Sequence, residues 1–92
     1  MQTEVTKYVR SLNRRHFTKN VQRVLFTLLT AEKHTVSRGA LRVPSATSRL
    51  RDLRKTEYGN FDIDCLTGTR TTFYRLNTNN ITLNQLRSVF GS

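Results

Sequence analysis

A dense set of hydrogen-bond donors lies between residues 45 and 55 of this chain. The segment reads Ser-Ala-Thr-Ser-Arg-Leu-Arg-Asp-Leu-Arg-Lys, so hydroxyl and guanidinium groups surround only a few apolar residues. Guanidinium groups bind planar anions and base edges through paired hydrogen bonds, and hydroxyl groups both donate and accept. These residue types indicate that the segment binds a polyanion.

The charge of the whole chain is consistent with such a ligand. Its 92 residues include 16 Lys and Arg against six Asp and Glu, which gives a formal charge of +10. Twelve of the basic residues are Arg, which favours bidentate contacts to phosphates and base edges. An acidic membrane surface would attract the same charge, but the most basic helix offers only Ala46, Leu50 and Leu53 to a bilayer. We therefore expect a nucleic-acid partner and no membrane partner.

Length and composition predict one domain over residues 1–92, which can be the N-terminal domain of a longer protein. The chain is 36% hydrophobic and has eight aromatic residues, enough to form a core. No apolar run approaches the roughly 20 residues of a membrane span, and the N-terminus lacks a signal-peptide core, so we expect a soluble intracellular protein. Cys65 is the only cysteine and alternates with Phe61 and Ile63, so it is expected to be a small buried hydrophobic residue.

Three helices are expected before the only proline. Apolar residues at helical spacing predict a short helix over residues 5–12 and a longer one over residues 17–29, for which Thr18 is the expected N-cap. Thr35 is expected to cap a third, short helix that ends near Leu41.

Pro44 marks the boundary before the basic segment. A proline disfavours α geometry in the residue before it, so we expect a break over residues 43–45 and a new helix over residues 46–55, with Ser45 as its cap. In that helix the three apolar residues share one narrow face. The outer face then carries hydroxyl and basic side chains: Thr47, Ser48, Arg51, Arg54 and Lys55.

Strand-like alternation follows the basic helix. Residues 61–65 and 71–76 alternate apolar and polar around the turn-forming residues 66–70, which predicts a β-hairpin. A last helix is expected over residues 81–90, capped by Thr82 or Asn80. Together these elements predict a mostly helical α+β domain of the winged helix-turn-helix kind, with three to four helices, a β-hairpin wing and a C-terminal helix.

A sequence resemblance points to the same fold. The run Ser48-Arg-Leu-Arg-Asp-Leu-Arg-Lys55, followed by Glu57-Tyr-Gly-Asn-Phe-Asp-Ile63, resembles the small helix-turn-helix domains of bacteriophages and other mobile elements. Their recognition helix ends in a pattern like Arg-Ile-x-x-Leu-Arg-Lys-x-Gly-Tyr-x-Ile. The match covers residues 35–76, but Tyr58 precedes Gly59 instead of following it, and Val43-Pro44-Ser45 replaces the usual glycine-containing turn.

This resemblance implies sequence-specific binding of double-stranded DNA in the cytoplasm of a bacterial host. Such domains occur as free transcription regulators and as the origin-binding ends of replication initiators or nucleases. A homodimer on repeated or palindromic sites is compatible with either role. No cofactor, metal ion or small-molecule ligand is expected.

Groove geometry assigns roles to individual side chains. The major groove admits one helix, so the candidate base contacts are Ser45, Thr47, Ser48 and Arg51. Arg51 is the strongest of them, because a guanidinium can hold guanine through two hydrogen bonds, for about 1–3 kcal/mol of discrimination. The candidate phosphate contacts are Arg49, Arg54, Lys55, Arg14, Arg15 and Lys19. Arg49 can instead pair with Asp52. At the wing, the candidate contacts to a minor groove or phosphate are Thr67, Thr69 and Arg70.

Three alternatives stay open on the sequence alone. Asp62 and Asp64, with Glu57 nearby, could bind Mg²⁺ as in a nuclease, although the chain has few acids for a complete ligand set. The helix over residues 81–90 could form a partner surface, which would make the chain an interaction module for a host or phage protein, but it is expected to complete the core. RNA binding would require exposed aromatic pairs for stacking, and Phe73 and Tyr74 are expected on opposite faces of the hairpin.

Overall fold

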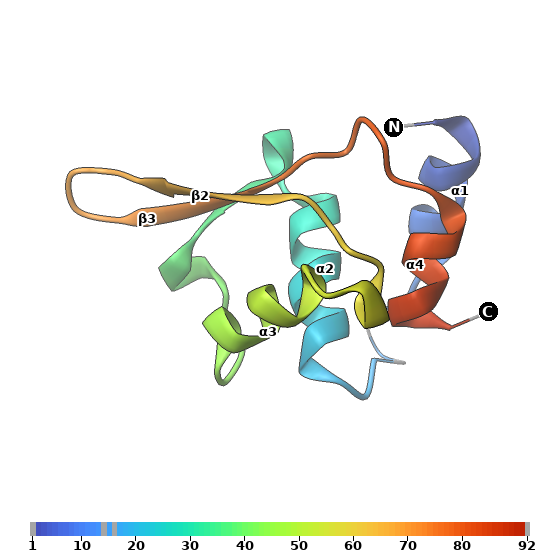
Figure 1. Cartoon of the computed structure of the whole chain (residues 1–92), viewed down its shortest axis with the longest axis horizontal. Helices are drawn as coiled ribbons and strands as arrows, with labels where there is room; N and C mark the ends of the chain where they lie inside the picture. Colours follow the sequence, from blue (N-terminus) through green and yellow to red (C-terminus); the bar gives the residue numbers. More distant parts are fainter. Residues whose placement is uncertain (1, 14, 16, 92) are drawn as a thin grey trace.

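A computed structural model of the chain describes residues 2–13, 15 and 17–91. This part of the chain forms a small α+β domain in which the helices gather at one end of an antiparallel sheet and a β-hairpin extends from the other (Figure 1). Its α-helices are α1 (Thr3–Ser11), α2 (Asn20–Thr30), α3 (Ala46–Leu53) and α4 (Leu83–Phe90). The expectation of an α+β domain with three to four helices is confirmed.

The sheet has three strands in the order β1-β3-β2, all antiparallel. They are β1 (Thr35–Ser37), β2 (Ile63–Thr67) and β3 (Thr72–Leu76). The predicted hairpin is confirmed, with Ile63 opposite Leu76 and Thr67 opposite Thr72. Its turn is tighter than residues 66–70, because pairing continues to Thr67 and the Gly68 N–H donates to the Thr71 carbonyl at 2.8 Å.

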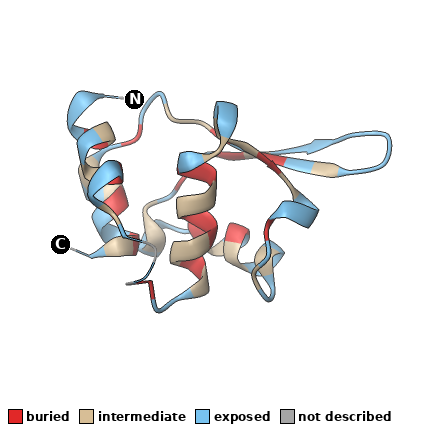
Figure 2. Cartoon of the chain, turned by 180° about the vertical axis from the view of Figure 1, so that it is seen from behind, coloured by how far each residue is buried: buried red, intermediate tan, exposed pale blue. Residues whose placement is uncertain are grey.

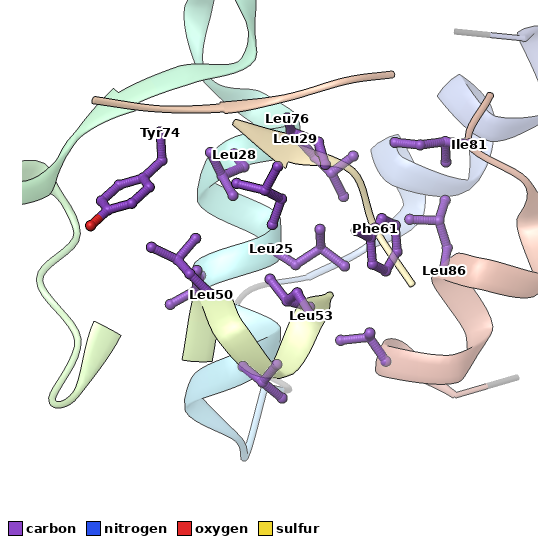
Figure 3. Close-up of a cluster of buried hydrophobic side chains, with 14 of the residues drawn as sticks. Leu25, Leu28, Leu29, Leu50, Leu53, Phe61, Tyr74, Leu76, Ile81 and Leu86 are labelled. Carbon is purple, nitrogen blue, oxygen red and sulfur yellow. The ribbon is translucent and has the colours of Figure 1, made fainter. Parts of the chain in front are cut away.

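The core lies where α2, α3 and α4 meet the inner face of the sheet (Figures 2 and 3). Leu25 and Leu28 of α2, Leu53 of α3, Leu86 of α4 and Phe61 are among its fully buried side chains. Burial of a large apolar side chain stabilises the fold by about 1.5–3 kcal/mol. The apolar side of the C-terminal helix therefore completes the core, as expected.

The predicted helix between Thr35 and Leu41 is wrong. Thr35–Ser37 is strand β1, which pairs with β3 so that Val36 lies opposite Tyr74. The next three residues form a single 3-10 turn, η3 (Arg38–Ala40), in which the Ser37 Oγ accepts a hydrogen bond from the Ala40 N–H at 3.3 Å. β-branched residues favour strands, and the long-range pairing with β3 supplies backbone partners that helical spacing could not reveal.

Two of the expected N-caps also differ. Helix α2 begins at Asn20, and the Gln22 Oε1 accepts a hydrogen bond from the Thr18 N–H at 3.1 Å instead of Thr18 capping the helix. The break over residues 43–45 is confirmed, but Ser45 is left-handed, with φ 56°, and its side chain makes no capping bond. Thr82 does cap α4, since its Oγ1 accepts from the Gln85 N–H at 3.3 Å.

Cys65 is exposed, so the expectation of a buried residue is wrong. The alternation is correct, because Cys65 shares the sheet face of Ile63, and its neighbour in the register is the buried Tyr74. However, the hairpin runs out past the helices, and nothing covers this face of β2 beyond Ile63 (Figure 2). Alternation indicates which face a side chain takes, but not whether another element covers that face.

Within the described residues, no helix is both long and apolar enough to cross a membrane.

Candidate nucleic-acid interface

Helix α3 is seated on α2 by its apolar side. Leu50 and Leu53 are buried, and they point toward the side chains of α2 (Figure 3). The helix starts directly after the Pro44 break and ends at Leu53, two residues before the predicted end. Packing by these two leucines leaves Thr47, Ser48 and Arg51 exposed on the opposite side of this short helix.

The outer face of α3 carries the predicted base contacts. Thr47, Ser48 and Arg51 are exposed, as is Ser45 just before the helix. No hydrogen bond or ion pair joins the side chain of Thr47, Ser48 or Arg51 to the part of the chain that the structure describes. Their donors and acceptors are therefore available to a ligand.

Asp52 neutralises two of the predicted phosphate contacts in the unbound chain. Its carboxylate lies 3.2 Å from the Arg49 Nε and 3.4 Å from the Lys55 Nζ. The expected pairing of Arg49 with Asp52 is confirmed. The Lys55 side chain is exposed, so its pair with Asp52 contributes only about 0–1 kcal/mol and Lys55 can exchange Asp52 for a phosphate at little cost. The Arg49 Nε is buried beside Asp52 and is less free to do so.

Arg54 has a structural contact that the sequence did not reveal. Its Nη2 donates a hydrogen bond to the Ile63 carbonyl, which links the end of α3 to the start of β2. The residue is still exposed and retains further N–H donors. Replacement of Arg54 would therefore disturb the fold as well as any phosphate contact.

The other predicted contact residues lie at the hairpin turn and in the segment before α2. At the hairpin turn, Thr67, Thr69 and Arg70 are all exposed. Arg15 and Lys19 are exposed before α2, whose N-terminal end lies on the same side of the hairpin as α3 (Figure 1). Arg14 lies outside the described residues.

Two exposed cations near α3 were missed by sequence reasoning. Arg38 lies in η3 and Arg42 in the loop that leads into α3. The sequence pattern places Arg38 in the predicted helix that ends near Leu41 and Arg42 in the connection after it, and neither position indicates exposure. A signal was present, because six of the 16 basic residues but only one acid lie between residues 38 and 55.

The acids of the hairpin have partners within the chain. The Asp62 Oδ2 accepts a hydrogen bond from the Asn77 Nδ2 at 3.1 Å, and the Asp64 Oδ2 lies 2.9 Å from the Arg75 Nη2. Among the described residues no three His, Cys, Asp or Glu side chains gather into a possible metal site.

The function has to be inferred from this geometry, because no protein-family model, curated protein or solved structure matches the chain. The outer face of α3 presents polar side chains that have no internal partner in the part of the chain that the structure describes, and exposed basic residues lie around it.

Proposed function

We propose that the chain binds double-stranded DNA, with α3 in the major groove and the hairpin as a wing beside it. The observation that carries the proposal is the outer face of α3, where Thr47, Ser48 and Arg51 are exposed and free of internal hydrogen bonds. Hydroxyl and guanidinium groups on one helix face match the donors and acceptors at base edges in the major groove.

The connectivity supports a winged-helix interpretation. A helix (α2), a strand (β1), a short turn (η3), a second helix (α3) and a hairpin (β2 and β3) follow one another, and β1 pairs with the second strand of the hairpin. This is the order of elements in winged helices, except that η3 replaces the first helix of the helix-turn-helix. A role as a phage or mobile-element regulator, or as an origin-binding domain, is the extension that the sequence resemblance suggests.

The net charge supports a polyanionic partner. A formal charge of +10 on 92 residues destabilises a compact chain by self-repulsion unless counterions or a ligand offset it. Contacts to duplex phosphates release the counterions of the DNA, so affinity falls as salt rises. The cations next to α3 would supply those contacts.

Sequence selection followed by two matched arginine replacements tests the proposal. Duplexes would be selected from a random library at about 0.15 M salt with excess non-specific duplex, conditions under which specific and non-specific binding diverge. Arg51→Ala should weaken binding to the selected duplex by about 5- to 150-fold, which corresponds to about 1–3 kcal/mol. The same replacement should weaken binding to a scrambled duplex much less. Arg87→Ala removes the same charge from an exposed position on α4 and should have little effect on either duplex.

The outcome separates DNA reading from its alternatives. Equal losses on selected and scrambled duplexes would remove base reading from Arg51. No enrichment of any duplex would contradict sequence-specific DNA binding, and no binding to any duplex would favour the interaction module. Because α4 buries Leu86 and Val89 in the core, the partner surface of such a module would have to lie elsewhere, and the exposed pair of Leu66 and Phe73 on the hairpin is the apolar alternative.

A further inference from the structure

A hollow of about 420 Å³ lies between η3 and the end of the hairpin. We call it the basic hollow, and it is lined by Arg38, Gly39, Gly68, Arg70, Thr71 and Thr72. Its origin is the length difference between two paired strands. β1 ends at Ser37, opposite Phe73, and the chain then folds into η3, while the hairpin continues outward (Figure 1).

The basic hollow brings two cations together without an acid. Arg38 and Arg70 come from distant parts of the sequence, both are exposed, and no Asp or Glu is among the lining residues. Neither guanidinium pairs with an acid in the part of the chain that the structure describes. Two like charges lining one hollow repel each other, and an anion between them would reverse this repulsion.

The other lining residues leave room for a ligand. Gly39 and Gly68 have no side chains, so their backbone forms part of the wall. A Cβ built on Gly39 would meet no atom within 4 Å. Thr71 and Thr72 add hydroxyl groups, which hydrogen-bond to anionic oxygens. The combination of two guanidinium groups, hydroxyls and open backbone suits a phosphate group.

We propose that the basic hollow binds one backbone phosphate of the duplex that lies on α3. This inference rests on the proposed function, because the bound duplex supplies the phosphate. In Figure 1, η3 and α3 lie on the same side of the hairpin, so a duplex on α3 can reach the hollow. A phosphate held there fixes the register and tilt of the duplex but carries no sequence information. The hollow is therefore a positioning site, distinct from the base-reading face of α3.

The salt dependence of duplex binding tests the inference. Each phosphate neutralised by the protein contributes about −0.9 to the slope of log K against log salt. If Arg38 and Arg70 share one phosphate, the double replacement Arg38→Ala with Arg70→Ala should reduce the magnitude of the slope by about 0.9. Two independent phosphates would reduce it by about 1.8, which would contradict a shared site. Arg87→Ala is the charge-matched control and should leave the slope unchanged.

A second pair of variants tests the hollow with both arginines in place. Gly39→Asp adds a carboxylate to the wall of the hollow and should weaken duplex binding and reduce the slope as the double replacement does. Gly39→Ala has space for its methyl group and should bind as the original chain does. Asn84→Asp adds the same negative charge on the exposed side of α4 and controls for long-range repulsion.

The two proposals fail in different ways. If the original chain binds duplex DNA and the hollow variants keep its affinity and slope, the inference about the hollow is wrong and the role of α3 stands. If inorganic phosphate alone saturates the Gly39 amide shift in NMR spectra while Gly39→Asp binds duplex normally, the hollow is a free-anion site and the inference is again wrong. If the original chain binds no duplex at all, the proposed function fails and the inference fails with it.

Discussion

Gly59 is the residue where a single methyl group should cost most, because backbone surrounds it. Its φ is +100°, and a Cβ at this position would lie 2.9 Å from the Gln85 carbonyl oxygen and 2.9 Å from the Phe61 Cε2. The left-handed region costs a non-glycine residue about 1–2 kcal/mol. Forcing a methyl group against packed neighbours adds about 1–3 kcal/mol. Gly59→Ala should therefore lower the free energy of unfolding by about 2–5 kcal/mol.

Urea and thermal unfolding would measure this loss. For a domain of this size, each kcal/mol lowers the Tm by about 4–8 °C, so the variant should melt at least about 8 °C below the original chain. Gly91→Ala is the matched control, because Gly91 also has positive φ, +84°, but no atom within 4 Å of its would-be Cβ. It should lose only the conformational cost of a backbone with φ 84° and ψ 176°, about 1–3 kcal/mol. A loss below about 2 kcal/mol for Gly59→Ala would refute the close approach of α4 to Gly59.

Three further outcomes are expected. The thiol of Cys65 should react with a disulfide reagent in the folded chain about as fast as in urea, because it is exposed, and strong protection would contradict the exposed hairpin. Asp52→Asn should tighten binding to scrambled duplex, measured by anisotropy, because it frees Arg49 and Lys55 for phosphates, while stability changes by at most about 1 kcal/mol. Burial raises the pKa of the Tyr8 phenol above its ordinary value. A raised pKa adds stability that is present below about pH 10 and lost as the pH rises through the folded value, so in urea melts at high pH the original chain should lose more stability than Tyr8→Phe.

The elements that local chemistry controls were predictable from the sequence. Pro44 restricts the backbone around itself whatever the surroundings, so the break over residues 43–45 and the start of α3 were correct. Thr82 was correct as a cap because its partner, the Gln85 backbone, lies three residues away. In both cases the interaction that decides the structure lies within a few residues of the signal.

Strand β1 and Cys65 could not be predicted because both depend on distant residues. Val36 is in a strand because β3 lies beside it, and Tyr74 is its register partner nearly forty positions later. Cys65 is exposed because the helices do not reach its part of the hairpin. Periodicity encodes the face that a side chain takes, whereas pairing and coverage are properties of the assembled fold.

The candidate site shows the same division. The outer face of α3 follows from the period of the helix, so the exposure of Thr47, Ser48 and Arg51 was foreseeable. Arg38 and Arg70 line one hollow because β1 ends before the hairpin does, and the sequence alone does not indicate where β1 ends. The contact of Arg54 with the Ile63 carbonyl likewise requires the chain to fold back through η4 (Thr56–Tyr58).

This fold-back joins α3 firmly to the hairpin. The Phe61 N–H donates to the Leu53 carbonyl at 2.8 Å, the Asn60 N–H donates to the Lys55 carbonyl at 2.9 Å, and Arg54 adds its bond to Ile63. Three bonds across one short connection, with Leu53 and Phe61 buried beside them, leave α3 little freedom to rotate relative to β2. The spacing between the outer face of α3 and the hairpin, whose far end lines the basic hollow, is therefore set in the free protein. If both sites bind one duplex, the entropic cost of aligning them has been met on folding, and the DNA rather than the protein has to adapt.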